Sequence, residues 1–453
     1  MKLSASPLRL AAAVLILSVS AGISPAFADA DTAALEKRLA ALEQEVASLR
    51  RQLEAKKEAE GRADSAAPVV TANAKDGFSI EAADDSFKFR ARGYVQADGR
   101  FFTQDKKDLG TTDTFVPRRV RPIFEGTVFK DYDFLIQPDF GNNTVTIQDA
   151  YAEYKYWPQL KLRAGKFKEP FGLERLQSDV NTSFIETGLP TLLTPNRDVG
   201  VQASGDFDEG WLTYQVGVFN GVADGGSADL DSNNDKDVAA RVFAQPFKEF
   251  DFEPIRGLGG GAAFTFGHEE GATPTIRSMG QATVFSYNTN SVADEPRGRF
   301  SPQAFWYWNR FGVLGEYVES TQELSRTTAG LKKKIKNDAW QVLGTWVLTG
   351  EDASYKGVTP RHPFDPSQRT WGAFELATRY GELLIDPDAF DLGFASRAVS
   401  VSAIQEWALG LNWYLNRNVK LMLDYSLSTF RDGGPAEDRK SEHVILTRAQ
   451  VQF

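Results

Sequence analysis

The stretch VKLMLDYSLS, residues 419–428, alternates between two kinds of side chain. Apolar and aromatic residues stand at every odd position from Val419 to Leu427, whereas Lys420, Asp424 and two serines stand at even positions. Successive side chains of a β-strand point to opposite faces of its sheet. The stretch is therefore predicted to be a strand with one face in apolar surroundings and the other face in water.

The same alternation recurs toward the end of the chain. Residues 407–413 alternate leucine and tryptophan with small or polar residues, and residues 445–453 alternate in the same way and end on Phe453. A terminal aromatic residue on an alternating strand resembles the signal that the outer-membrane insertion machinery reads. This ending argues against a soluble β protein.

Alternating segments continue upstream to residue 86. They number about sixteen, each about 8 to 13 residues long, which is the length that a tilted transmembrane strand needs. An even number puts both ends of a barrel on the same side of the membrane. The predicted strands are 86–97, 118–129, 132–140, 145–156, 160–167, 197–206, 210–219, 237–246, 257–267, 299–309, 311–320, 338–349, 370–381, 403–415, 418–430 and 443–453.

The connections between these segments alternate in length, as expected for the short periplasmic turns and long external loops of outer-membrane barrels. A soluble sandwich gives no reason for this alternation, so the sequence predicts an all-β, antiparallel transmembrane barrel over residues 86–453 in the outer membrane. One connection in each class breaks the pattern, because 141–144 is short and 350–369 is long. The other long connections are 98–117, 168–196, 220–236, 268–298, 321–337, 382–402 and 431–442.

Three segments precede the predicted barrel. Residues 1–28 have a basic start, an apolar core and a small-residue end, which predicts a secretory signal peptide cleaved near Ala28. In residues 29–57, leucines and a valine recur at spacings of three and four from Leu35 to Leu53, which predicts a coiled coil or an amphipathic helix that packs on its own protein. Residues 58–85 are predicted to be a linker.

Composition excludes several other classes of protein. After the signal peptide, no run of the chain approaches the ~18 apolar residues that a membrane-spanning helix needs. There are no cysteines, which excludes disulfides and thiolate metal sites, and the three histidines stand in no metal-ligand or nucleophile spacing. We therefore expect neither an enzyme nor a cofactor or metal, and nothing indicates a nucleic-acid partner.

Basic residues concentrate in one part of an acidic chain. The chain without residues 1–28 has 49 basic and 61 acidic residues, a formal charge of −12, yet residues 87–175 have 16 basic and 12 acidic residues. A charge that faces lipid near the midplane costs about 2 to 4 kcal/mol, so inward orientation is expected for any arginine on such a strand. The basic residues that the alternation places in the lumen are Lys88, Arg90, Arg92, Arg119, Arg121, Lys161, Arg163, Arg241, Arg379 and Arg448.

Two interpretations of these lumen residues remain open. They could simply pair with Asp133, Asp149 or Glu153 as part of the wall. Alternatively, clustered guanidinium groups in a narrow aqueous passage would lower the barrier for anions and bind oxyanions through forked hydrogen bonds.

The long connection 168–196 is too apolar for a solvated external loop. Phe171, Leu173, Leu176, Phe184 and Ile185 need a surface to bury against. If the loop folds into the barrel, it brings three further polar residues to the constriction; otherwise it packs across a subunit interface. These three residues are Lys168, Arg175 and Ser178.

Several motifs resemble the phosphate-selective porin O/P family and together span most of residues 87–453. They are RRVR (118–121), EGTVFKD (125–131), QDAYAEY (148–154), LRAGKFKEPF (162–171), LER (173–175), AWQV (339–342) and LTGE (348–351). The resemblance implies a homotrimer of sixteen-stranded barrels that pass phosphate or related small anions along basic lumen residues, with the third external loop folded inward. It also implies a role for Asp149, which could accept a hydrogen bond from a protonated phosphate.

Two features depart from a simple phosphate pore. The external segment 220–237 is acidic, whereas four lysines stand between residues 332 and 336 in the predicted loop before Ala339. The N-terminal coiled coil is not needed for a pore and could hold subunits together or reach toward peptidoglycan. The alternatives are therefore a general diffusion porin with little anion selectivity and a barrel that tethers the outer membrane to the cell wall.

Overall fold

The computed structural model describes residues 28–66, 68–73, 77–104, 111–231, 233–327, 330–434 and 438–453. The chain divides into two compact units, residues 1–67 and residues 68–453, which are described separately. The predicted signal peptide lies outside the described residues except for its last residue.

The first unit contains one long helix, α1 (Ala28–Ala66). Its seam residues from Leu39 to Leu53 are about half exposed, with Leu39 at 59% and Leu53 at 56%. No helix in the described ranges has both the length and the hydropathy needed to cross a membrane.

The interval 58–85 differs from the predicted linker. Helix α1 continues through its first part, because alanine, glutamate and lysine favour helix. A β-hairpin of β1 (Val69–Asn73) and β2 (Gly77–Glu81) follows, and β2 pairs with the first barrel strand. The sequence signal for β1 is its two valines and a threonine, which favour strands.

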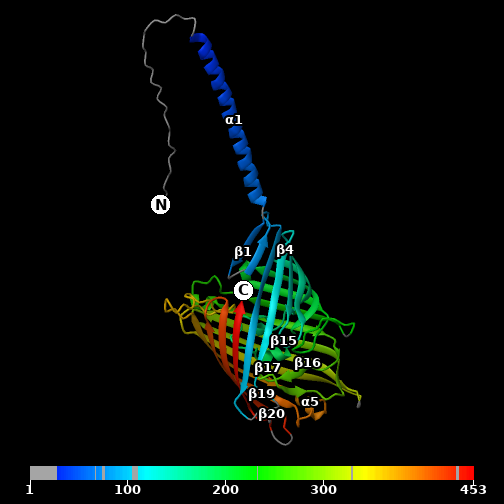
Figure 1. The fold of residues 1–453 in the computed structure, drawn as a ribbon. Coiled ribbons are helices and arrows are strands. Elements are labelled where there is room, and N and C mark those ends of the chain that lie inside the picture. Colours follow the sequence, from blue (N-terminus) through cyan, green and yellow to red (C-terminus); the bar gives the residue numbers. More distant parts are fainter. Residues whose placement is uncertain are drawn as a thin grey trace. The chain divides into compact units, whose positions relative to one another are not determined.

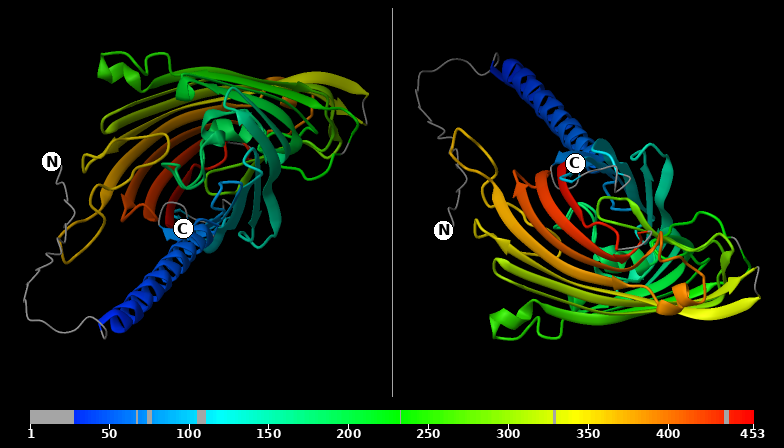
Figure 2. Two further views of the ribbon diagram at one scale, coloured as in Figure 1. Left: turned by 90° about the horizontal axis from the view of Figure 1, so that it is seen from above. Right: turned by 90° about the horizontal axis from the view of Figure 1, so that it is seen from below.

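Sixteen strands form the closed antiparallel barrel in the part of the chain that the structure describes, as the alternation predicts. Figure 1 shows them side by side in one curved wall, and Figure 2 shows this wall from above and below. The strands are β3 (Phe87–Phe102), β4 (Thr114–Val128), β5 (Tyr132–Asp139), β6 (Thr146–Trp157), β7 (Leu160–Lys168), β8 (Arg197–Phe207), β9 (Leu212–Phe219), β10 (Asp237–Ala244), β11 (Leu258–Gly267), β15 (Ser291–Trp308), β16 (Phe311–Arg326), β17 (Leu331–Val347), β18 (Ala373–Leu384), β19 (Val401–Tyr414), β20 (Val419–Asp432) and β21 (Glu442–Gln452).

The barrel closes where its last strand pairs with its first, with Val451 opposite Val95. Along β20 the predicted faces are correct: Leu421 and Leu423 are exposed on the outer face, while Lys420 and Asp424 are buried on the inner face. The outer face can therefore contact lipid and the inner face forms a polar lumen.

Several strands extend beyond their predicted ends. Residues 321–337 were predicted to be a loop, but β16 runs to Arg326 and β17 begins at Leu331, so only a short tip connects them. Cross-strand pairs such as Lys336 with Glu319, at 2.7 Å, stabilise this extension. The 268–298 connection contains the short strands β12 (Glu270–Gly271), β13 (Thr275–Arg277) and β14 (Thr283–Ser286), and β15 takes up its last part.

Apolar side chains fill one half of the lumen. Phe171, Leu189 and other buried residues pack against Val318 of β16 and Ala339 of β17 in one cluster. Leu173 and Phe184 pack in a second cluster with wall residues that include Leu314 of β16 and Leu343 of β17. Core thus occupies the part of the lumen beside β16 to β19. Two polar cavities lie along the wall from β3 to β8 and are described below.

Candidate functional site

The connection 169–196, called the inserted loop below, crosses the lumen to the far wall. The backbone N–H of Ile185 donates to Asp424 Oδ2 of β20 at 2.7 Å. Lys420 Nζ of the same strand donates to the carbonyl oxygen of Thr182 at 2.9 Å. The prediction that this loop folds into the barrel is therefore confirmed.

One carboxylate of the far wall holds the first turn of the inserted loop. Glu316 of β16 accepts hydrogen bonds from the backbone N–H groups of Leu173, at 2.7 Å, and Glu174, at 3.3 Å. These two N–H groups open the helical turn α3 (Leu173–Leu176), where free N–H groups attract negative charge. Gln341 of β17 donates to both Glu174 and Glu316, which ties the loop and the wall into one network.

The long turn that breaks the predicted pattern, residues 348–372 between β17 and β18, contacts the inserted loop from the periplasmic side. Tyr355 Oη donates to the carbonyl oxygen of Leu173 at 2.6 Å. Gln177 Nε2 of the loop donates back to the carbonyl oxygen of Tyr355 at 2.7 Å. The ring of Tyr355 also stacks on Phe305 of β15, with centroids 5.4 Å apart. This turn therefore helps to fix the position of the inserted loop in the lumen.

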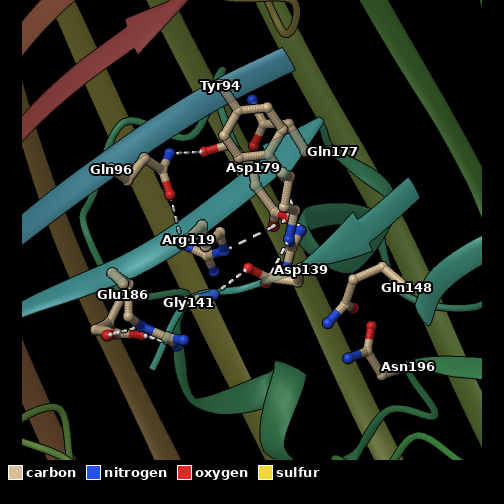
Figure 3. A network of polar contacts seen from close by, with 12 residues as sticks. Tyr94, Gln96, Arg119, Asp139, Gly141, Gln148, Gln177, Asp179, Glu186 and Asn196 are labelled. Carbon is tan, nitrogen blue, oxygen red and sulfur yellow. Dashed lines mark hydrogen bonds and ion pairs between the residues drawn. The ribbon is translucent and has the colours of Figure 1, made fainter. Parts of the chain in front are cut away.

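On the opposite side, the inserted loop places Asp179 among arginines of β4. Arg119 Nε lies 3.7 Å from Asp179 Oδ2, and Arg121 also forms an ion pair with this carboxylate. Arg121 Nε donates to Asp139 Oδ2 of β5 at 2.6 Å. Figure 3 shows Arg119, Asp139 and Asp179 converging beside Tyr94 and Gln96 of β3.

The pKa of Asp179 reflects its burial and the positive charges around it. Burial alone would raise it, but the positive charges of Arg119, Lys168, Arg121 and Arg197 outweigh burial and hold the pKa well below its usual range. Asp179 therefore stays negatively charged, and it attracts the surrounding cations and partly neutralises them.

Arg118 also points inward, although strict alternation would turn it toward lipid. Its guanidinium binds both carboxylate oxygens of Glu186 in the inserted loop, at 3.1 and 3.2 Å. A β-bulge between Gln96 and Ala97 accounts for this orientation, because β4 then has one residue more than β3 at this point. The two consecutive arginines at 118 and 119 are the signal in the sequence for this feature, but alternation alone does not place Arg118 in the lumen.

A cavity of about 210 Å³ lies directly on the periplasmic side of Asp179. Four of its lining residues are cations: Arg92, Lys168, Arg197 and Arg417. Its polar lining also includes Tyr94, Gln137, Ser178, Asp179, Asn418 and Gln452. Arg417 stands in the turn between β19 and β20, and its guanidinium forms no ion pair with any residue that the structure describes.

A second cavity, of about 420 Å³, lies along the same wall. It is lined by the cations Lys88, Arg90 and Lys155 and by the carboxylates of Glu125 and Asp133. The two cavities together are lined by seven cationic side chains and three carboxylates, Asp179 included. Glu81 and Asp149 pair with Lys88 and Arg197 from outside the lining, so two excess positive charges remain. They share strand β3, on which Arg90 and Arg92 stand two residues apart.

Several predicted residues reach these cavities. Arg92 and Arg90 both contact Glu125, at 2.8 and 3.6 Å. Lys168 lines the first cavity and donates to the carbonyl oxygen of Gln177 at 2.8 Å. Ser178 lines the same cavity.

Other predicted residues are engaged elsewhere. Arg163 pairs with Glu153 at 2.7 Å, and Arg241 donates to Gln303 at 3.0 Å on a more distant part of the wall. Arg175 donates to Thr194 at 3.0 Å and fixes the inserted loop internally, so it does not reach the cavities.

Two further predicted residues need separate comment. Lys161 forms no ion pair within the described ranges and lines neither cavity. Asp149 accepts a hydrogen bond from Arg197 at 3.0 Å and so holds that arginine, while its suggested contact with a phosphate hydroxyl stays a prediction. The sequence analysis did not predict Arg197 and Arg417 as lining residues, because Arg197 begins a strand after the long loop and Arg417 stands in a turn.

Comparison with known proteins agrees with this geometry. The family described as phosphate-selective porin O and P matches residues 89–453. Porin O of Pseudomonas aeruginosa is 24% identical over 390 residues, which cover 79% of this chain and 86% of that protein. The fold is similar to that of three solved structures, described next.

The outer membrane channel DcaP of Acinetobacter baumannii has a TM-score of 0.52 at 12% identity, covering 81% of this chain and 98% of that chain. OmpT of Vibrio cholerae, in a trimer form, has a TM-score of 0.53 at 12% identity, covering 82% and 100% of the two chains. An anion-selective porin from Comamonas acidovorans has a TM-score of 0.51 at 11% identity, covering 81% and 100%. These three likenesses concern the fold alone.

Proposed function

The chain belongs to the phosphate-selective porin O and P family, which makes it an outer-membrane channel rather than an enzyme, and we propose that it passes small oxyanions, phosphate foremost. The proposed path runs along the wall from β3 to β8, beside the inserted loop. The positive excess along the two cavities of this wall is the observation that carries the proposal, and it amounts to two charges when the paired Glu81 and Asp149 are counted with the lining residues.

Basic residues in a narrow aqueous passage act on anions in two ways. They lower the electrostatic barrier to entry, and their N–H groups replace part of the water that a phosphate loses. Arg92 and Arg197 offer planar forks that match phosphate oxygens, while Lys168 adds a compact charge. Glu125 and Asp149 hold these two arginines in place, so the cations keep a fixed geometry without being fully neutralised.

Phosphate block of the chloride current tests the proposal. In planar bilayers, phosphate should reduce the chloride current of the wild-type channel in a saturable manner. The double variant Arg92→Gln, Lys168→Gln should lose most of this block, because both residues line the first cavity. Lys130→Gln, in the exposed turn after β4, is the matched control and should keep the block.

A general diffusion porin with little anion preference is the second candidate. It is favoured by the ion pairs along the same wall, since Arg119, Arg121 and Arg163 each contact a carboxylate. Such a channel would conduct without saturable block by phosphate, so the same experiment separates the two functions.

We further propose a homotrimer whose subunits associate partly through α1. The seam of Leu39, Leu42, Val46, Leu49 and Leu53 is about half exposed in one chain, and a partner helix would bury it. Deletion of residues 31–60 should leave the conductance of one channel unchanged but weaken the trimer in detergent. If cells with this deletion kept normal trimers but their outer membrane detached from the cell wall, the result would instead favour a tether to peptidoglycan.

A further inference from the structure

The hairpin of β1 and β2 extends the barrel wall past the end of the last strand. On β3, the backbone of Gly93 exchanges two hydrogen bonds of 2.9 Å with Phe453, the last residue of the chain. Strand β2 then becomes the neighbour of β3, with Phe78 opposite Ala91 and Ile80 opposite Phe89. Figure 1 shows β1 above the end of the chain marked C. The hairpin therefore lies on the periplasmic side of Phe453.

The two faces of the hairpin differ in character. Val70, Phe78 and Ile80 share one face, because Val70 stands opposite Ile80 and Phe78 stands two residues before Ile80 on the same strand. These three side chains are 73%, 62% and 49% exposed. On the other face the hydroxyl groups of Thr71 and Ser79 bind each other at 2.6 Å. The polar face is thus satisfied within the chain, whereas the apolar face is left open.

The apolar face continues onto the barrel through Phe89 of β3, which is 39% exposed. Val70, Phe78, Ile80 and Phe89 are called the hairpin patch below. None of its members is charged, so two copies of the patch can meet without electrostatic repulsion. A contiguous exposed apolar surface of this kind marks a contact with another molecule.

Lipid hydrocarbon does not account for the hairpin patch. Aromatic belts mark the boundary between hydrocarbon and headgroups in outer-membrane barrels. At the periplasmic ends of the neighbouring strands, Trp413 and Phe374 stack with ring centroids 5.5 Å apart, and Phe453 ends β21. On β3, Phe89 stands four residues beyond Gly93, a step of about 13 Å along the strand. The patch therefore lies past the belt, where water or protein surrounds it.

The chain itself indicates which protein is at hand. Only residues 67 and 68 stand between Ala66, where α1 ends, and Val69, where β1 begins. Three steps of the chain span at most ~11 Å. Packed helices lie about 8 to 10 Å apart. Association of three copies through the seam of α1 would therefore bring the three hairpins to within about 30 Å of one another.

We propose that the hairpin patch packs against a second copy of this chain, so that β1 and β2 form part of the contact between subunits. The inference rests on the trimer proposed above and adds to it a contact surface outside α1. It also gives the hairpin a role, since the sixteen-stranded barrel is closed without β1 and β2.

Photo-cross-linking of the full-length protein in outer-membrane vesicles tests which molecule covers the patch. A benzophenone amino acid takes the place of Phe78 in one variant and of Phe252 in the control. Phe252 stands in the turn between β10 and β11 and is also 62% exposed. Illumination should give covalent dimers of this chain from position 78 and none from position 252. Products with phospholipid or with another protein in place of such dimers would overturn the proposal.

The double variant Phe78→Gln, Ile80→Gln gives a second measurement. The concentration at which the detergent-purified trimer is half dissociated should rise at least about tenfold, because two large apolar side chains no longer favour association. The control Phe250→Gln, Phe252→Gln should leave this concentration unchanged, and the single-channel conductance of each variant verifies that its barrel is folded. An equal midpoint in the double variant and the wild type would overturn the proposal.

Two outcomes separate this inference from the trimer on which it rests. A wild-type protein that native mass spectrometry shows to be trimeric, but that gives no dimers from position 78, would overturn the hairpin contact alone. A wild-type protein that is monomeric and still conducts would overturn the trimer together with the contact.

Discussion

Asp179 Oδ2, on the inserted loop, lies 3.7 Å from Arg119 Nε on the barrel wall. The loop thus brings a negative charge to the point where the wall is most basic. The carboxylate holds Arg119 and Arg121 in position and at the same time cancels part of their charge. Mutation can therefore separate the effect of this carboxylate on the position of the two arginines from its effect on their charge.

Replacing Asp179 by asparagine should make the channel more selective for anions. The side chain keeps its size and can still accept a hydrogen bond, but the cations of the constriction lose their nearest negative charge. We expect the chloride-to-potassium permeability ratio to rise about threefold or more. The reversal potential in a KCl gradient measures this ratio.

The matched control for this change is Asp352→Asn. Asp352 stands in the 348–372 turn with 76% of its side chain exposed, so its charge is screened by solvent. A ratio that stays the same or falls in Asp179→Asn would contradict the role given to Asp179.

Loss of Glu316 should release the start of the inserted loop. In Glu316→Ala the backbone N–H groups of Leu173 and Glu174 lose their acceptor, and each buried, unsatisfied N–H costs about 1 to 3 kcal/mol. We expect a larger and noisier single-channel conductance and faster proteolysis of the inserted loop.

Glu323→Ala, on the outer face of the same strand, is the control and should behave like the wild type. A conductance of Glu316→Ala that matches the wild type in size and noise would show that the loop is held in the lumen without this contact.

The contact between Glu186 and Arg118 should make the inserted loop sensitive to acid. Burial would raise the pKa of Glu186, but the charges of Arg118 and Arg100 outweigh it and lower the pKa to about 2. Because this value lies below the ordinary 4.5, the pairing stabilises the folded loop fully above about pH 4.5, and this stabilisation is lost as the pH falls toward 2.

As the pH falls from about 4.5 toward 2, the conductance should therefore change as this pairing is lost. Recordings on wild type and Glu186→Gln across this range check the prediction, since the glutamine variant should lack the acid-dependent step. If both channels showed the same acid-dependent step, the step would belong to another titratable group.

Much of the fold follows from the alternation of residues such as Leu421 and Leu423 with Lys420 and Asp424. Alternation reports which face of a strand meets lipid, and it places Arg119 and Arg121 inward correctly. The apolar residues of the inserted loop, Phe184 among them, indicate that the loop must be buried, but from the sequence alone entry into the lumen and packing across a subunit interface both remain open.

The rest depends on long-range or local geometry that a period of two does not encode. Asp179 meets Arg119 only because the loop folds inward, and a bulge turns Arg118 toward the lumen. The run of lysines from 332 to 336 lies in β17 and not in a loop, because cross-strand partners such as Glu319 offset the repulsion between like charges.

The zero-current potential of the wild-type channel in a KCl gradient tests the proposed anion path most directly. A path lined by seven cations and three carboxylates predicts a potential shifted toward the chloride equilibrium value. A potential shifted toward the potassium value would contradict an anion path along the wall from β3 to β8.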